Sequence, residues 1–162
     1  FPAYLEGKVI NALKATHPYE EVAYDVYALE NAHNQVGAGM LGELASPVDE
    51  TAFLQHIKQR LNTPMIRHTP LLGIPITKVA WCGGSGSFLL PQAVRAGADL
   101  FITGDYKYHD FFDSENQIVI ADIGHYESEQ FTIDLIGDAM KKKFVTFAVH
   151  LTELNTNPVN YL

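Results

Sequence analysis

Hydrophobic positions recur at helical spacing in two stretches of the first half of the chain. One stretch covers residues 6–16. The other opens at Ser46-Pro47, where Asp49 completes a capping-box pattern. Its apolar face, which the pattern predicts to be buried, carries Phe53, Leu54, Ile57 and Leu61.

Strand patterns in this half are fewer and shorter. Residues 21–29 alternate as a strand does, residues 36–44 form a glycine-studded strand or bend, and residues 65–69 indicate a short strand. One helix and one strand over residues 6–29 cannot bury both their faces alone. The pair must therefore lean on a part of the protein that is absent here or on the rest of the chain, and residues 30–35 are the best linker candidate by composition.

From Ile76 onward, apolar strands alternate with helices. This alternation predicts an α/β domain with a mostly parallel sheet and helices on both faces. The predicted strands cover residues 76–82, 99–103, 118–122 and 144–150, and the helices or helical turns cover residues 89–97, 108–113 and 127–143.

Composition narrows the function classes. The chain has 162 residues, 47% of them hydrophobic, which is enough for a substantial core. A net charge of −8 argues against binding to nucleic acid, which needs clustered basic residues. The basic run Lys141-Lys142-Lys143 is better explained as the end of a helix, where cations complement the helix dipole.

Cys82 is the single cysteine, so no internal disulfide can form and a reducing, cytoplasmic location is expected. No run of about eighteen apolar residues is present, so we expect no membrane association. The chain starts at Phe1-Pro2 instead of methionine, which suggests the interior of a longer gene product.

Three loops should meet at the carboxyl edge of the sheet, where ligands bind in such folds: residues 83–87, 103–110 and 122–129. In the third loop, His125 and Glu129 are four residues apart and would share one face of a helix. An imidazole and a carboxylate at that spacing are suited to hold Zn, Mn or Fe. Asp122 could accept a hydrogen bond from the imidazole.

Continuing that helical row leads to Ile136 and Met140, which predicts that the row faces inward. The alternative is that Glu127 and Glu129 are first-turn acids favoured by the dipole, with His125 bonded to backbone. Two ligands also do not close a metal site.

His109 is a candidate acid, base or ligand near the same edge, with Asp105 and Asp110 as possible orienting groups. The alternative is that His109 only caps a helical turn. The "GGSGS" segment of residues 83–87 is a weak phosphate-loop candidate, because the lysine of a P-loop is missing, and a tight turn is the better interpretation.

"TGDYKYHD" and "DIGHYESE", together with "GAGMLGEL", "KVAWCGGSGSFL" and "TNPVNYL", resemble the Nif-three-like family, whose bacterial members are named GTP cyclohydrolase type 2 homologs. "THPYEEVAYDVYAL" resembles the end of a ferredoxin-like, PII-like (CutA-like) insert domain. On this resemblance, residues 1–30 are the remnant of that insert, residues 31–36 are a linker, and residues 37–162 are the C-terminal half of the metal-binding domain.

The resemblance implies two divalent metal ions per full-length subunit, with His125 and Glu129 as ligands and His109 close to the metals. The remaining ligands would come from a His-rich motif and an aspartate in an N-terminal half. It also implies a homo-oligomer, a hexameric ring, and a small-molecule substrate.

The functional expectation is therefore a metal-dependent hydrolase, similar to GTP cyclohydrolase type 2, in the full-length protein, with the isolated fragment inactive. The alternative is a non-catalytic metal-binding protein with a regulatory or partner-binding role.

Overall fold

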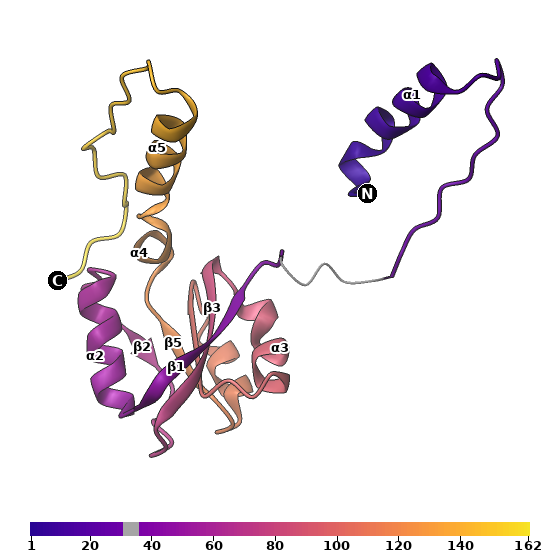
Figure 1. Ribbon diagram of the computed structural model, residues 1–162. Coiled ribbons are helices and arrows are strands. Elements are labelled where there is room, and N and C mark those ends of the chain that lie inside the picture. Colours follow the sequence, from indigo (N-terminus) through magenta and orange to yellow (C-terminus); the bar gives the residue numbers. More distant parts are fainter. Residues whose placement is uncertain (31–35) are drawn as a thin grey trace. The chain divides into compact units, whose positions relative to one another are not determined.

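The computed structural model describes residues 1–30 and 36–162, which fall into two compact units, Phe1–Gln35 and Val36–Leu162 (Figure 1). Residues 31–35 of the predicted linker lie outside the described residues. The assignment of residues 1–30 to an insert domain stays a prediction.

The first unit contains a short 3₁₀ turn, η1 (Ala3–Leu5), and helix α1 (Glu6–Thr16), as the periodicity predicts. The helix ends at Thr16, and its C-cap residue, His17, has the extended backbone that suits a residue preceding proline. The prediction of a strand over residues 21–29 is wrong. Among the described residues of this unit no second strand exists to pair with it, and an isolated strand has no partner for its backbone groups.

The second unit is built on a five-stranded sheet with the order β1-β3-β4-β5-β2. Only the central strands β3, β4 and β5 are parallel, since both edge strands pair antiparallel to their neighbours. The sheet is therefore mixed, and the prediction of a mostly parallel sheet holds for its centre. Each neighbouring pair of these parallel strands is joined by a crossover that contains helical turns, as parallel pairing requires. The strands are β1 (Met40–Val48), β2 (Arg67–His68), β3 (Ile76–Ser85), β4 (Leu100–Gly104) and β5 (Val119–Asp122).

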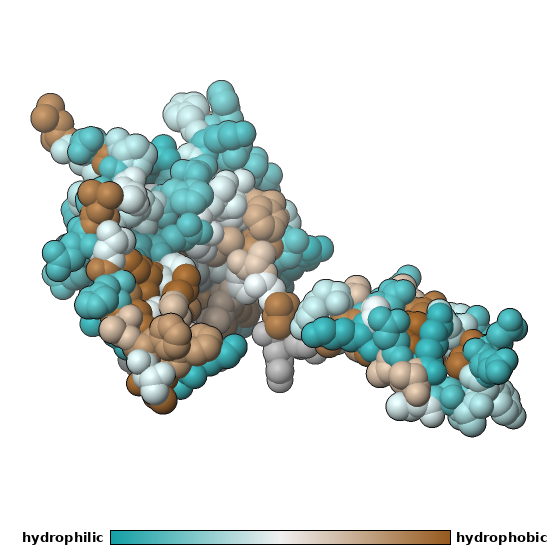
Figure 2. All heavy atoms as spheres, turned by 90° about the horizontal axis from the view of Figure 1, so that it is seen from above, coloured by the Kyte–Doolittle hydropathy of each residue, from teal (hydrophilic) through white to brown (hydrophobic). Residues whose placement is uncertain are grey.

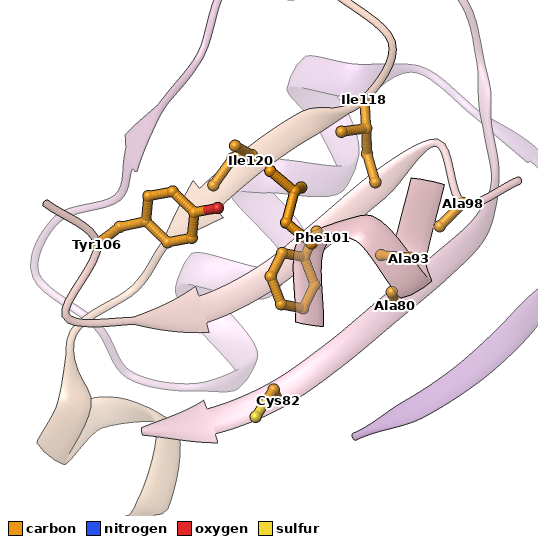
Figure 3. Close-up of a cluster of buried hydrophobic side chains, with 9 residues drawn as sticks. Ala80, Cys82, Ala93, Ala98, Phe101, Tyr106, Ile118 and Ile120 are labelled. Atoms are coloured by element: carbon orange, nitrogen blue, oxygen red, sulfur yellow. The ribbon is translucent and has the colours of Figure 1, made fainter. Parts of the chain in front are cut away.

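Helices cover both faces of the sheet, as predicted (Figure 1). Helix α2 (Glu50–Arg60) covers one face, and η2 (Ser87–Leu89) with α3 (Leu90–Arg95) covers the other. Figure 3 shows Phe101 beside Ala93 of α3, in a cluster that shares the face with Ile118 and Ile120. The opposite cluster contains Leu54, Ile57, Ile76, Leu100, Ile102, Val119, Ala121 and Ile123.

Helix α2 begins later than the sequence suggests. Ser46 and Pro47 belong to β1, and Asp49 is the N-cap residue itself, accepting a hydrogen bond from the Ala52 backbone N–H at 2.9 Å. The predicted buried face is confirmed: Leu54 and Ile57 are buried, while Phe53 and Leu61 are partly buried against them.

The helix predicted over residues 127–143 is two helices, α4 (His125–Glu129) and α5 (Thr132–Lys143). The interruption changes the helical phase, so the row through His125 and Glu129 does not continue. Ile136 and Met140 are exposed, and the prediction that they face inward is wrong. Lys141, Lys142 and Lys143 do occupy the last turn of α5, as predicted.

The strand predicted over residues 144–150 is also absent from this described segment. The chain turns where the Phe147 N–H donates to the Phe144 carbonyl, and Val145 and Phe147 remain exposed. The edge positions of the sheet belong to β1 and β2, so the central strands are already fully paired. Figure 2 shows that hydrophobic residues, drawn in brown, lie at the molecular surface among hydrophilic ones. Within residues 1–30 and 36–162, no helix is both long enough and apolar enough to cross a bilayer.

Asp99 joins the start of β4 to β3. Its carboxylate accepts from the N–H and hydroxyl of Thr77, both at 2.7 Å, and from the Lys78 N–H at 2.8 Å. Burial on its own would raise the pKa of Asp99, but these hydrogen bonds and the charge of Lys78 outweigh burial and lower the pKa below its ordinary value.

We expect Asp99→Asn to lose about 1 kcal/mol of unfolding free energy at pH 7, because the side chain is partly exposed and its charged hydrogen bonds are modest. The interactions that lower the pKa of Asp99 in the folded protein stabilise the fold fully above the ordinary carboxyl pKa of about 3.9. This contribution disappears as the pH falls through the pKa that Asp99 has in the folded protein. Urea unfolding from pH 7 to pH 3 should show wild type and variant converging at acid pH. A difference that does not shrink as the pH falls would contradict this origin.

Candidate metal site

The loops that follow β3, β4 and β5 meet at one edge of the sheet, as the sequence predicts for parallel strands. Ser85 pairs with Gly104, and Thr103 pairs with Asp122. A Cβ atom on Gly104 would lie 2.9 Å from the backbone of Gly124, so the last two loops approach this closely because Gly104 has no side chain.

His125 and Glu129 lie side by side on α4 at this edge. The His125 Nε2 and Glu129 Oε2 atoms are 3.3 Å apart, and each side chain is 50% exposed. Gly84, at the end of β3 with a φ of +61°, lies directly against both: a Cβ atom there would be 2.7 Å from Glu129 Oε1 and 3.2 Å from His125 Nε2. The four-residue spacing therefore places two potential metal-ligand atoms, one nitrogen and one oxygen, side by side and accessible to solvent.

The other imidazole nitrogen, Nδ1, lies 2.6 Å from Asp105 Oδ2. This hydrogen bond is the main reason why the pKa of His125 is raised above its ordinary value, with further contributions from the charges of Asp105 and Glu129. Asp105 thus orients His125, and the proposed role of Asp122 as the partner of this imidazole is wrong. The suggestion that Asp105 orients His109 is not supported either.

Asp122 has a different role, because its carboxylate is only 3% exposed and binds three separate segments. It accepts from the Tyr106 and Gly124 backbone N–H groups, each at 2.9 Å, and forms an ion pair with Arg67. The same Arg67 nitrogen, Nη2, donates to the Tyr106 carbonyl at 2.8 Å. Asp122 therefore fixes the backbone on both sides of the Asp105–His125 pair.

A cavity of about 660 Å³ opens in front of these residues. Its lining joins the carboxyl edge of the sheet, β2 and the C-terminal segment. It contains Met65, Arg67, Asp105, Asp122, Gly124, His125, Tyr126, Glu127, Glu129, Gln130, Asn157, Pro158, Val159 and Tyr161.

Glu127 holds the C-terminal segment against this cavity. Glu127 lies in the first turn of α4, as the alternative interpretation expects, but its side chain is 4% exposed and accepts from the Asn157 amide at 3.0 Å. Burial, together with the charge of Glu127, raises the pKa of Tyr161, and the charge of Arg67 opposes this increase. Sequence reasoning missed Arg67, Asn157 and Tyr161, because residues so distant in sequence show no shared spacing.

His109 begins a 3₁₀ turn, η3 (His109–Ser114), and is exposed, with its ring 5.2 Å from the Tyr108 ring. It does not line the cavity described above. A catalytic role for His109 stays a prediction.

The glycine segment after β3 has internal hydrogen-bond partners. The Gly84 N–H donates to the Ser128 hydroxyl at 2.8 Å and the Gly86 N–H to the Thr103 hydroxyl at 3.0 Å. These donors are not free for a phosphate, which favours the structural interpretation of the segment. Cys82 is buried, as predicted. The pKa of its thiol is raised, mainly by burial and to a smaller extent by the charge of Glu129.

His125 and Glu129 supply two possible ligands. Across the described ranges, no group of three or more His, Cys, Asp or Glu side chains is arranged to hold a metal ion. Asp105 is close, but it engages the opposite nitrogen of the imidazole.

Comparison with known proteins identifies the family. A family model described as Duf34/NIF3 (NGG1p interacting factor 3) matches residues 4–158. The chain belongs to the Duf34/NIF3 family. The resemblance seen in the sequence motifs is thereby confirmed.

Relatives within the Duf34/NIF3 family include proteins named "GTP cyclohydrolase 1 type 2 homolog". The one from Bacillus subtilis is 34% identical and matches 100% of this chain and 44% of its own length. The one from Staphylococcus epidermidis is 34% identical and matches 93% of this chain and 42% of its own length. The chain therefore spans less than half the length of these curated relatives.

The fold agrees with a solved Duf34/NIF3 structure. A Bacillus cereus protein related to NIF3 superposes with a TM-score of 0.76 at 35% identity, covering 100% of this chain and 46% of that one. The mixed α/β architecture described above is thus the fold of this part of the family.

We expect Gly84→Ala to separate His125 from Glu129 in this Duf34/NIF3 chain, because the new methyl group would collide with the Glu129 carboxylate. Gly73→Ala is a matched control, since Gly73 has a φ of +73° with nothing within 4 Å of the added Cβ. Both variants should lose about 1 to 2 kcal/mol through backbone strain. Only Gly84→Ala should shift the NMR signals of the His125 ring, and unchanged signals would contradict the described contact.

Proposed function

We propose that this chain contributes His125 and Glu129 to a divalent-metal centre. The observation that carries the proposal is the arrangement of the imidazole, which has Asp105 on Nδ1 and the Glu129 carboxylate 3.3 Å from Nε2. A carboxylate on one nitrogen of a histidine is the usual way to aim the other nitrogen at a metal ion.

The donor chemistry fits a divalent cation. When the neutral imidazole donates Nδ1–H to Asp105, its lone pair is on Nε2, the nitrogen beside Glu129. The cavity is also rich in negative charge, which favours a cation: Asp105, Asp122, Glu127 and Glu129 line it, against the single arginine Arg67.

Two protein donors hold a cation weakly, so the proposed centre needs ligands from outside the described residues. The length of the relatives leaves room for them, because the chain covers less than half of each curated relative. The family resemblance supports a His-rich motif and an aspartate as these ligands, a second metal ion, and a hexameric assembly.

The reaction proposed for the full-length protein is metal-dependent hydrolysis. Bound divalent ions would lower the pKa of a coordinated water and polarise the substrate. In this chain, His125 and Glu129 would bind the metal, Asp105 would hold the imidazole, and the buried Asp122 would fix the surrounding backbone. His109 is a candidate for proton transfer. The names of the relatives suggest opening of a purine ring, as in GTP cyclohydrolases, as a first reaction to test.

We expect His125→Ala and Glu129→Gln to remove most of the bound metal from the full-length protein, as measured by elemental analysis after gel filtration. Asp105→Asn should weaken metal affinity by roughly 10-fold to 100-fold, since it removes the acceptor that orients the ring. His56→Ala is the control, because His56 is exposed on α2 and lies outside the cavity. Unchanged metal content in all three site variants would overturn the metal-centre proposal.

Turnover separates the two functional alternatives. Hydrolysis of nucleotides or phosphoesters that depends on Mn, Zn or Fe and is lost in Glu129→Gln supports a hydrolase. Tight metal binding without turnover on any of these substrates supports the non-catalytic role.

A further inference from the structure

Arg67 is the residue of the cavity that the proposed metal centre does not use. It lies on the short edge strand β2 and lines the same cavity as His125 and Glu129. Its side chain is 51% exposed, whereas its partner Asp122 is almost completely buried. Arg67 is therefore held by a buried partner while about half of its side chain stays accessible.

One nitrogen of the guanidinium makes all of its hydrogen bonds. Nη2 donates to the Tyr106 carbonyl and to Asp122, and the group also lies over the Phe111 ring, 5.5 Å from its centroid. Among the described residues, Nε and Nη1 have no hydrogen-bond acceptor. A planar cation fixed in this way presents pre-oriented donors without a further loss of side-chain entropy.

The charge of the lining indicates what these donors could bind. Arg67 is the one arginine or lysine in the cavity lining, where it faces four carboxylates. With Nη2 engaged, the N–H groups on Nε and Nη1 point in different directions, so each can donate singly. Hydrogen bonds from a guanidinium to the oxygens of an oxyanion are charge-assisted and strong.

We propose that Arg67 binds a phosphate group of the substrate through an N–H group of Nη1 or Nε, beside the proposed metal centre. The inference rests on the proposed function, because the four carboxylates would repel a phosphate unless bound cations offset them. Phosphate is favoured over a carboxylate because its greater charge interacts more strongly with both the cations and the guanidinium. A phosphomonoester and a nucleotide would present the same group to Arg67.

The test uses inorganic phosphate as the probe and isothermal titration calorimetry of the full-length protein, with and without bound Mn²⁺. Metal content is measured on the same samples. Phosphate should bind the Mn²⁺-loaded wild type and not the metal-free protein. Arg67→Met should weaken this binding by roughly tenfold or more, as expected for the loss of a charge-assisted hydrogen bond. Arg67→Lys keeps the charge with a different arrangement of N–H groups, so its loss should be smaller.

Two further variants keep the test decisive. Arg60→Met is the matched control, because Arg60 is exposed on α2 and does not line the cavity; it should leave phosphate affinity unchanged. If Arg67→Met fails to fold because Asp122 loses its partner, the double variant Arg67→Met/Asp122→Asn removes the buried charge as well. Ordinary thermal unfolding shows whether each variant is folded.

The outcomes distinguish this inference from the proposed function. Equal phosphate affinity in wild type and in folded Arg67 variants would overturn the inference while leaving the metal centre intact. Absence of phosphate binding to the Mn²⁺-loaded wild type would do the same. Absence of bound Mn²⁺ in the wild type would overturn the proposed function itself. Among nucleotides and simple phosphomonoesters, the one that loses most affinity in Arg67→Met identifies which source of the phosphate the site prefers.

Discussion

The arrangement of the site depends on the buried carboxylate of Asp122. A charge in this position is tolerable only when it is well paired, and here the Tyr106 N–H, the Gly124 N–H and Arg67 supply the partners. These partners belong to three different segments of the chain. The carboxylate thereby fixes the loop after β4 and the start of α4 relative to each other. Asp105 directly precedes Tyr106, and His125 directly follows Gly124. The same carboxylate therefore brings Asp105 and His125 together.

Glycines allow the same loops to approach closely. Gly104 lies against the backbone of Gly124, and Gly84 lies against the side chains of Glu129 and His125, so any larger residue would push these elements apart. The carboxyl edge of the parallel strands brings the loops together, and the absent side chains let them touch. The ring nitrogen and carboxylate of α4 are held at the mouth of the sheet as a result, instead of projecting freely into solvent.

The proposed chemistry follows from how charge is distributed around this edge. Carboxylates outnumber cationic groups in the cavity lining, which suits a divalent cation held at His125 and Glu129 and leaves Arg67 as the basic group beside it. A centre whose ligands come from two parts of a protein would also couple metal binding to the docking of those parts, because the binding free energy stabilises only the assembled state. The chain belongs to the Duf34/NIF3 family and spans less than half the length of the curated relatives, and the proposal places the missing ligands outside the described residues.

Local patterns in the sequence determined much of this unit. Apolar strands that alternate with helices form β4 and β5, and the cap at Asp49 begins α2. The four-residue spacing places His125 beside Glu129. These features depend on residues close together in the chain, whose geometry is set by the helix and strand repeats themselves. Only the tertiary structure decided which acid orients His125, since Asp105 lies 20 residues away, and which base pairs with Asp122, since Arg67 lies 55 residues away. It also decided the antiparallel edges of the sheet and the break between α4 and α5. Such choices depend on packing between distant segments, which no local periodicity records.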